Sequence, residues 1–137
     1  MCRVKIPFVS KESSVPVIRF LLSNGEEAYG ICDSGSESTL FSKELVKKNK
    51  DLFEELPVDS MVDIVSLSNK DSYVFVEKKT NIHFEGDDKE IEVTGMLFDF
   101  TSITSHFNDI TISALFGSDF LENHKAVIDY KNCYVTV

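Results

Sequence analysis

Short segments rich in β-branched and aromatic residues, separated by tight-turn signals, constrain this chain more than any other feature. Val15–Leu22 is typical of a strand and runs into Asn24-Gly25, a β-hairpin turn signal, after which Glu26–Cys32 returns as the second arm. Further strands are predicted at Tyr73–Val76, Asn81–Glu85, Glu90–Phe98, Ala126–Tyr130 and Tyr134–Val137. Such a series predicts a mainly β fold.

Two short helices complete the expected secondary structure. They are Lys43–Lys50, capped by Ser42, and Asp119 to Asn123 or His124, capped by Ser118. In the first helix, Glu44 lies four residues before Lys48, a spacing that favours an ion pair along the helix. A length of 137 residues is that of an ordinary domain, so we expect residues 1–137 to form one domain.

Charge and cysteine usage exclude several classes of function. A net charge of −9, from 14 basic and 23 acidic residues, argues against nucleic acid and anionic membranes as partners. No apolar run approaches the ~20 residues of a membrane span, and Met1–Pro7 lacks the apolar stretch of a signal peptide. Cys2, Cys32 and Cys133 are too widely spaced for a cysteine zinc site or a disulfide framework. We therefore expect a reducing, cytoplasmic location, with Cys32 as a small core residue.

The segment around Asp33 carries the chemistry. An apolar strand delivers Asp33 into a Ser34-Gly35-Ser36 turn, and an apolar chain resumes at Leu40-Phe41. The simplest interpretation is an Asx-type turn, in which the Asp33 carboxylate accepts hydrogen bonds from nearby backbone N–H groups. Taken without its surroundings, the tetrapeptide favours this interpretation.

A phosphate-binding loop is excluded. Gly30 and Gly35 have the P-loop spacing, but Ser36-Glu37 stand where Lys-Ser/Thr is required. Asp33, inside such a loop, would also repel phosphate.

A serine nucleophile and a metal site are disfavoured as well. Ser34 or Ser36 would need a histidine base, and His83, His106 and His124 stand in no recognisable catalytic setting. The three histidines also lack metal-ligand spacing, so no metal is expected.

Several separated segments together resemble the retropepsin-like family of aspartic proteases. Asp33-Ser34-Gly35-Ser36 matches the D-[ST]-G-[AS] signature of pepsin-like and retroviral-type enzymes, with a hairpin before it and Leu40-Phe41 after it. Leu115-Phe116-Gly117 looks like the apolar-apolar-Gly segment that enters a short helix in that family. Ala126–Tyr130 is similar to the closing strand of retrotransposon-type members, so the resemblance spans residues 15–137.

The resemblance implies a fold and a reaction. The fold is a closed or partly open β-barrel, half of a pepsin-like fold, with one or two short helices. The reaction is hydrolysis of peptide bonds by a water held between two carboxylates, one ionised and one protonated, with no cofactor. Asp33 would be catalytic, Gly35 would allow close backbone approach, and Ser34 would cross-link the two active-site loops. Ser36 would donate a hydrogen bond to the carboxylate.

The resemblance also implies a homodimer, because this chemistry needs two Asp-Ser/Thr-Gly loops and the sequence has one. Two copies of Asp33 must then meet across a two-fold axis. Cys2–Phe8 and Tyr134–Val137 would supply interface strands. The partner to be cleaved would be an extended polypeptide, bound as a β-strand.

A flap over the substrate is expected in the hairpin Val62–Val76. Its tip would comprise Leu67, Ser68, Asn69, Lys70, Asp71 and Ser72. Because this tip has no glycine, unlike the glycine-rich flap of retroviral members, an ordinary surface hairpin stays an alternative.

Two rival functions remain open. One is a catalytically idle retropepsin-like domain that serves as a dimerisation or peptide-binding module. The other is an unrelated small all-β domain, in which Asp33 has a structural turn as its only role.

Overall fold

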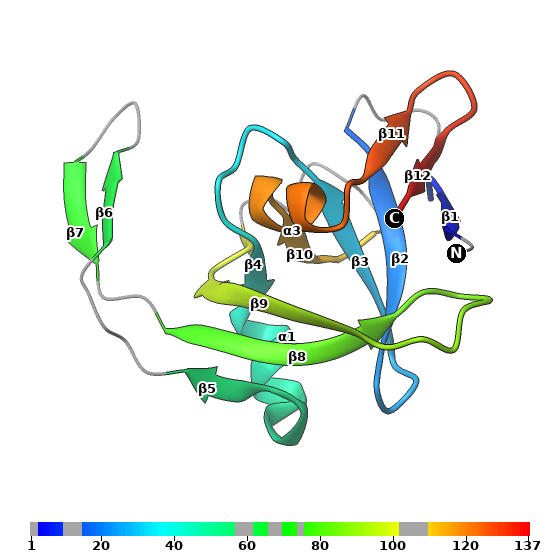
Figure 1. Ribbon diagram of the computed structural model, residues 1–137. Coiled ribbons are helices and arrows are strands. Elements are labelled where there is room, and N and C mark those ends of the chain that lie inside the picture. Colours follow the sequence, from blue (N-terminus) through cyan, green and yellow to red (C-terminus); the bar gives the residue numbers. More distant parts are fainter. Residues whose placement is uncertain (1–2, 10–14, 57–61, 66–69, 74–75, 102–109) are drawn as a thin grey trace.

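In the computed structural model, the described residues form a β-barrel with two short α-helices, α1 (Lys43–Lys48) and α3 (Ser118–Asn123) (Figure 1). It describes residues 3–9, 15–56, 62–65, 70–73, 76–101 and 110–137. Among these residues, no helix combines the length and the apolar character that a membrane crossing requires.

Six strands close the barrel. Around the ring they are β2 (Val17–Leu22), β3 (Glu27–Cys32), β10 (Ile112–Phe116), β4 (Leu40–Ser42), β9 (Ile91–Phe98) and β8 (Glu77–His83). Pairing of β2 with β8 completes the circle, and β5 (Glu54–Leu56) lies on the outside of β8. The β3–β10 and β4–β9 pairs are parallel and the others are antiparallel, so the sheet is mixed. The predicted mainly β, closed-barrel architecture is confirmed.

Alternation along β2 fills the barrel interior. Ile18, Phe20 and Leu22 are fully buried, as the period of two along a strand requires. The Phe20 ring packs edge-to-face on Phe116, which also lies against the bare backbone of Gly30. A Cβ atom at position 30 would stand 2.5 Å from the Phe116 ring, so the absence of a side chain there makes room for the aromatic core.

The β2–β3 hairpin forms where the Asn-Gly signal predicts it. Gly25 has φ of +85°, a conformation that favours glycine, and its N–H donates to the Leu22 carbonyl at 2.8 Å. Register across the hairpin pairs Val17 with Ile31. This register places the end of β3, where the Asp33 turn begins, beside the start of β2.

Both chain ends lie in a second, three-stranded sheet, in the order β1 (Lys5–Pro7), β12 (Tyr134–Thr136), β11 (Val127–Asp129). Val4 and Val137 exchange two backbone hydrogen bonds of 3.0 Å, which extend the β1–β12 ladder. The inner face of this sheet packs on the barrel through Ile6 and Val135. The N-terminal and C-terminal strands therefore pair with each other within one chain.

The predicted strand at Tyr73–Val76 lies partly outside the described residues, because residues 74–75 are not described. Tyr73 ends β7 (Lys70–Tyr73), which pairs with β6 (Val62–Val65), and Val76 is not part of a strand.

Of the predicted flap tip, Lys70, Asp71 and Ser72 belong to β7, with Lys70 paired to Val65 on β6. The role of this hairpin as a flap stays a prediction. Leu67, Ser68 and Asn69 lie outside the described residues.

The two α-helices form close to their predicted positions. Helix α1 (Lys43–Lys48) is capped by the Ser42 hydroxyl, which accepts hydrogen bonds from two backbone N–H groups, and the short 3-10 helix η1 (Lys50–Leu52) follows. Helix α3 (Ser118–Asn123) has Gly117 as its N-cap residue, not Ser118. Ser118 is the first helical residue, and its N–H, which has no partner within the helix, donates to the Ser36 carbonyl.

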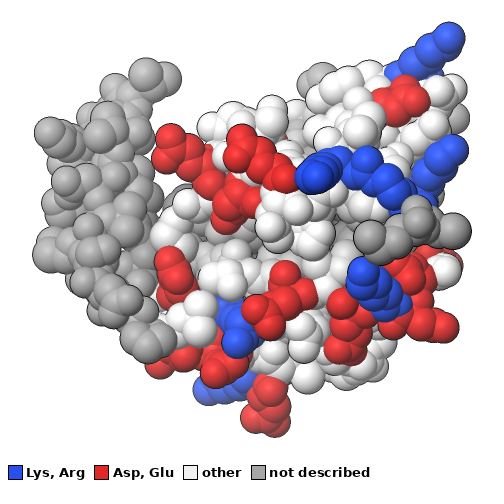
Figure 2. All heavy atoms as spheres, viewed as in Figure 1, with Lys and Arg blue, Asp and Glu red and all other residues white. Residues whose placement is uncertain are grey.

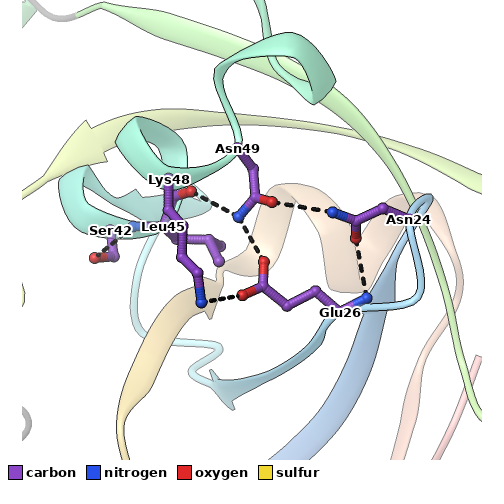
Figure 3. A network of polar contacts seen from close by, with 6 residues as sticks. All are labelled: Asn24, Glu26, Ser42, Leu45, Lys48 and Asn49. Carbon is purple, nitrogen blue, oxygen red and sulfur yellow. Dashed lines mark hydrogen bonds and ion pairs between the residues drawn. The ribbon is translucent and has the colours of Figure 1, made fainter.

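A polar network ties the β2–β3 turn to the end of α1 (Figure 3). Lys48 Nζ lies 2.5 Å from Glu26, not beside Glu44 as the helical spacing suggested. Asn49 Nδ2 donates to Glu26 at 2.6 Å, and Asn24 Nδ2 donates to Asn49 at 3.2 Å. The hydrogen bonds from Lys48 and then Asn49 hold the pKa of Glu26 below its usual range.

We predict that Glu26→Gln lowers the free energy of unfolding at pH 7 by about 1 kcal/mol. Because folding lowers the pKa of Glu26, its stabilisation is complete at neutral pH and is lost as pH falls below about 4, through the folded-state pKa. Urea unfolding at pH 7 and pH 3 measures both values. Glu27→Gln is the control, since Glu27 is exposed and lies 3.7 Å from its cationic partner. An equal deficit for Glu26→Gln at both pH values would contradict the role of the charge.

Candidate active site

Asp33 stands directly after β3, where the strand leaves the barrel. Its backbone N–H donates to the Phe116 carbonyl at 3.0 Å, which continues the parallel pairing of β3 and β10 by one residue. Its Oδ1 accepts a hydrogen bond of 2.9 Å from the Gly35 N–H, and its own carbonyl accepts one from Ser36. The half-buried carboxylate is thus oriented by its own turn, as an Asx turn requires.

The turn is also held from outside, by Gly117. The Ser118 N–H donates to the Ser36 carbonyl at 2.7 Å. A Cβ atom on Gly117 would lie 2.6 Å from the Ser38 carbonyl, so only glycine permits this approach. The structure therefore brings the Asp33 turn and the Leu115-Phe116-Gly117 segment together, and this segment enters a short helix as predicted.

The second link between these segments is a pair of residues that sequence reasoning missed, Thr39 and Asp119. Asp119 accepts hydrogen bonds from the Thr39 N–H at 3.1 Å and from the Thr39 hydroxyl at 2.7 Å. The same hydroxyl accepts the Gly117 N–H at 3.2 Å, inside the core. In the sequence, Asp119 is simply an acid in the first turn of a helix, so its position gives no hint of a partner 80 residues away.

The serines of the turn behave differently from each other. Ser34 is exposed, as is Gly35, and the role of Ser34 as a cross-link between two loops stays a prediction. Ser36 is half-buried, and its hydroxyl donates to the Ser38 carbonyl at 2.9 Å. A serine has one hydroxyl proton, so the expected hydrogen bond from Ser36 to the Asp33 carboxylate is wrong.

The two described histidines lie on elements other than the Asp33 turn. His83 lies on β8, His124 follows α3 as its C-cap, and His106 lies outside the described residues. Burial and then the charge of Lys89 lower the pKa of His124. Within the described ranges, no three His, Cys, Asp or Glu side chains gather as a metal site would need.

We predict that Asp119→Ala lowers the free energy of unfolding by about 2–3 kcal/mol, because it leaves the buried Thr39 N–H and hydroxyl without their acceptor. Chemical denaturation measures the loss. Glu122→Ala, an exposed acid on the same helix, should stay within about 0.5 kcal/mol of the parent. Equal effects of the two substitutions would show that Asp119 does not anchor the loop.

Cys32, the residue before Asp33, is buried in the core, and burial raises the pKa of its thiol to about 12. The prediction of a small core residue is confirmed. At pH 8 only about 1 thiol in 10⁴ is then ionised. We predict that iodoacetamide at pH 8 modifies the half-exposed Cys133 in the native protein, and Cys32 only after denaturation. Mass spectrometry of the peptides resolves the two sites, and modification of both at one rate would contradict the burial of Cys32.

Comparison with known proteins gives a likeness of structure alone. Neither a protein-family model nor a curated protein matches the sequence. The structure is similar to a retropepsin-like aspartic protease from Rickettsia conorii, with a TM-score of 0.56 and 17% identity over 98% of this chain and 90% of that one.

Two further solved structures agree with this likeness. The retroviral protease-like domain of Ddi1 from Leishmania major has a TM-score of 0.54 and 15% identity, over 90% of this chain and 92% of that one. EIAV protease in complex with an inhibitor has a TM-score of 0.56 and 12% identity, over 88% and 98%. At these identities the likeness establishes the fold and not the activity. The chain has a retropepsin-like fold.

Proposed function

We propose that the protein is an aspartic endopeptidase whose active site forms from two copies of Asp33 at a homodimer interface. The position of Asp33 carries the proposal. Its carboxylate follows a barrel strand, is oriented by the Gly35 N–H, and sits in a turn anchored to Gly117. Catalytic carboxylates need such a rigid support, because a small displacement of a catalytic group strongly lowers the reaction rate.

The reaction follows from the chemistry of a carboxylate pair. Two carboxylates in contact share one proton, so one is ionised and the other protonated. The ionised carboxylate takes a proton from water as the water oxygen attacks the peptide carbonyl carbon. The protonated carboxyl group donates to the carbonyl oxygen. Collapse of the intermediate breaks the C–N bond, and the amine leaves with the proton that the first carboxylate had taken from water.

The anchoring of the turn supports this function over a purely structural turn. An Asx turn explains the hydrogen bond between Asp33 and Gly35, but it needs no second segment. Here the second segment binds the loop and its continuation: the Ser118 N–H donates to the Ser36 carbonyl, and the Gly117 N–H donates to the Thr39 hydroxyl. The substrate would be an extended polypeptide, bound as a β-strand.

A catalytically idle domain of the same fold is the second candidate. The observation in its favour is that the Asx turn already satisfies one oxygen of Asp33 within one chain. In that case the fold would serve dimerisation or peptide binding without hydrolysis.

We predict that Asp33→Asn abolishes cleavage of an unstructured polypeptide such as casein, by about 10²–10⁴-fold or more. The amide can neither accept the proton of water nor supply one. Asp88→Asn, in an exposed turn, is the matched control and should retain activity. Fluorescent peptide release across pH 3–8 measures the rate. Undiminished cleavage by Asp33→Asn would overturn the proposal, and absence of cleavage by the parent would favour the idle domain.

Mixing the parent protein with the Asp33→Asn variant tests whether activity requires two Asp33 side chains or one. After subunit exchange, activity should fall with the square of the parent fraction, because a mixed dimer has one carboxylate. A linear fall would mean that one Asp33 is sufficient.

A further inference from the structure

A pocket of about 280 Å³ lies between β1 and the β2–β3 hairpin. It is lined by residues 6–9, by Arg19 and Tyr29 of the hairpin, and by Glu85. Its volume is near the lower end of the range for ligand pockets, which suits a single side chain better than a large ligand. Among the described residues, those of the Asp33 turn do not line it, so the pocket is separate from the candidate active site.

The pocket opens where Pro7 interrupts the contact between β1 and β2. The Val9 N–H donates to the Val17 carbonyl at 2.8 Å, which begins an antiparallel contact between the two segments. Two residues further on, Pro7 and Arg19 both line the pocket, and Pro7 has no N–H to continue the ladder. Pairing of β2 with β8 begins only at Leu21. Within the described part of the chain, no strand therefore pairs with Arg19 on this edge of β2.

The backbone of Arg19 faces this unpaired edge. Hydrogen bonds between β2 and β3 use the even-numbered residues of β2 and its flank: the Leu22 N–H donates to the Glu26 carbonyl, and the Cys32 N–H to the Pro16 carbonyl, each at 2.9 Å. Alternation along an antiparallel strand then turns the N–H and carbonyl of Arg19 away from β3. A backbone donor and acceptor at an unpaired edge can bind an extended peptide as an added strand.

Apolar and charged side chains surround these backbone groups. Ile6 is buried and Tyr29 is half-buried, so the pocket offers apolar and aromatic surface to a ligand. Arg19 forms ion pairs with both Glu85 and Glu27, whose side chains are exposed. Because two carboxylates share one guanidinium group, the rim of the pocket carries a net negative charge.

The loop that begins at Glu85 extends this negative charge. Residues 85–90 include four acids and one lysine. Figure 2 shows acidic side chains at the lower right of the viewed face, where Figure 1 places the tip of the β8–β9 hairpin. Charge complementarity therefore favours a basic ligand.

We propose that this pocket docks an extended basic peptide of a partner protein, which pairs with the backbone of Arg19 and inserts one bulky apolar side chain. Side chains two positions apart lie on the same face of a strand, so basic residues two positions before and after the apolar one would reach Glu27 and Glu85. Tyr29 lies four residues before Asp33, about 13 Å along the strand. Docking here requires no catalysis, and the proposal does not depend on the proposed function.

An NMR titration with the peptide acetyl-Lys-Thr-Phe-Thr-Lys-amide tests the docking site. The Asp33→Asn variant is used, so that the peptide stays intact whatever the activity of the parent. We expect saturable shifts of the backbone amide signals of Val9, Arg19 and Tyr29, while the signals of the Asp33 turn stay in place. Replacing the phenylalanine of the peptide by alanine should weaken binding about 10-fold or more, because the aromatic ring supplies the apolar surface that is buried. Equal affinity of the two peptides would overturn the proposal.

A charge reversal at the rim supplies a matched pair of variants. Glu85→Lys should weaken binding of the basic peptide about 5-fold or more, and should strengthen binding of acetyl-Glu-Thr-Phe-Thr-Glu-amide. Asp88→Lys makes the same change of charge at an exposed position of the same loop, outside the pocket, and should alter the affinity less than about 2-fold. Equal effects of the two variants would show that overall charge attracts the peptide, and would overturn the docking site.

Three controls test the other possible occupants. Binding of acetyl-phenylalanine-amide as tight as that of the pentapeptide would make the pocket a small-molecule site and overturn the peptide. Shifts of the same signals on raising the protein concentration without peptide would mean that a second copy fills the pocket. Absence of shifts at millimolar peptide would overturn the docking site altogether. None of these results bears on Asp33, whose role is tested by cleavage.

Discussion

The close approach of Gly117 to the Ser36–Ser38 backbone is the contact on which the rest of the site depends. It lets two segments far apart in the chain meet at the end of the barrel, one after β3 and the other after β10. A methyl group at position 117 would collide with backbone atoms, which cannot turn aside as a side chain can. Once the approach is made, Ser118, Thr39 and Asp119 can supply the hydrogen bonds that hold the turn.

Features governed by neighbouring residues could be predicted from the sequence. The Asn24-Gly25 turn, the Ser42 cap and the strand character of β2 depend on local backbone preferences, and all three appear in the structure. The Leu115-Phe116-Gly117 segment was identified through the resemblance to a family, but its contact with the Asp33 turn was not predicted, since no local rule connects the two.

Features that depend on tertiary partners could not be predicted in this way. Lys48 has Glu44 one helical turn away but reaches Glu26 on the hairpin, because the fold places that carboxylate closer. The Ser36 hydroxyl donates to the Ser38 carbonyl, a partner that the Asp33-Ser34-Gly35-Ser36 motif alone does not indicate. Asp119 looks like an ordinary helix-start acid until the fold buries Thr39 beside it.

Pairing of the two chain ends with each other has a consequence for how the molecule assembles. Because β1 and β12 find their partners within one chain, folding of a single copy need not wait for a second. Folding and association are then separate equilibria, and the association can be weak without endangering the fold. A site shared by two such copies would be built at high local concentration and taken apart on dilution, with each half remaining folded between encounters.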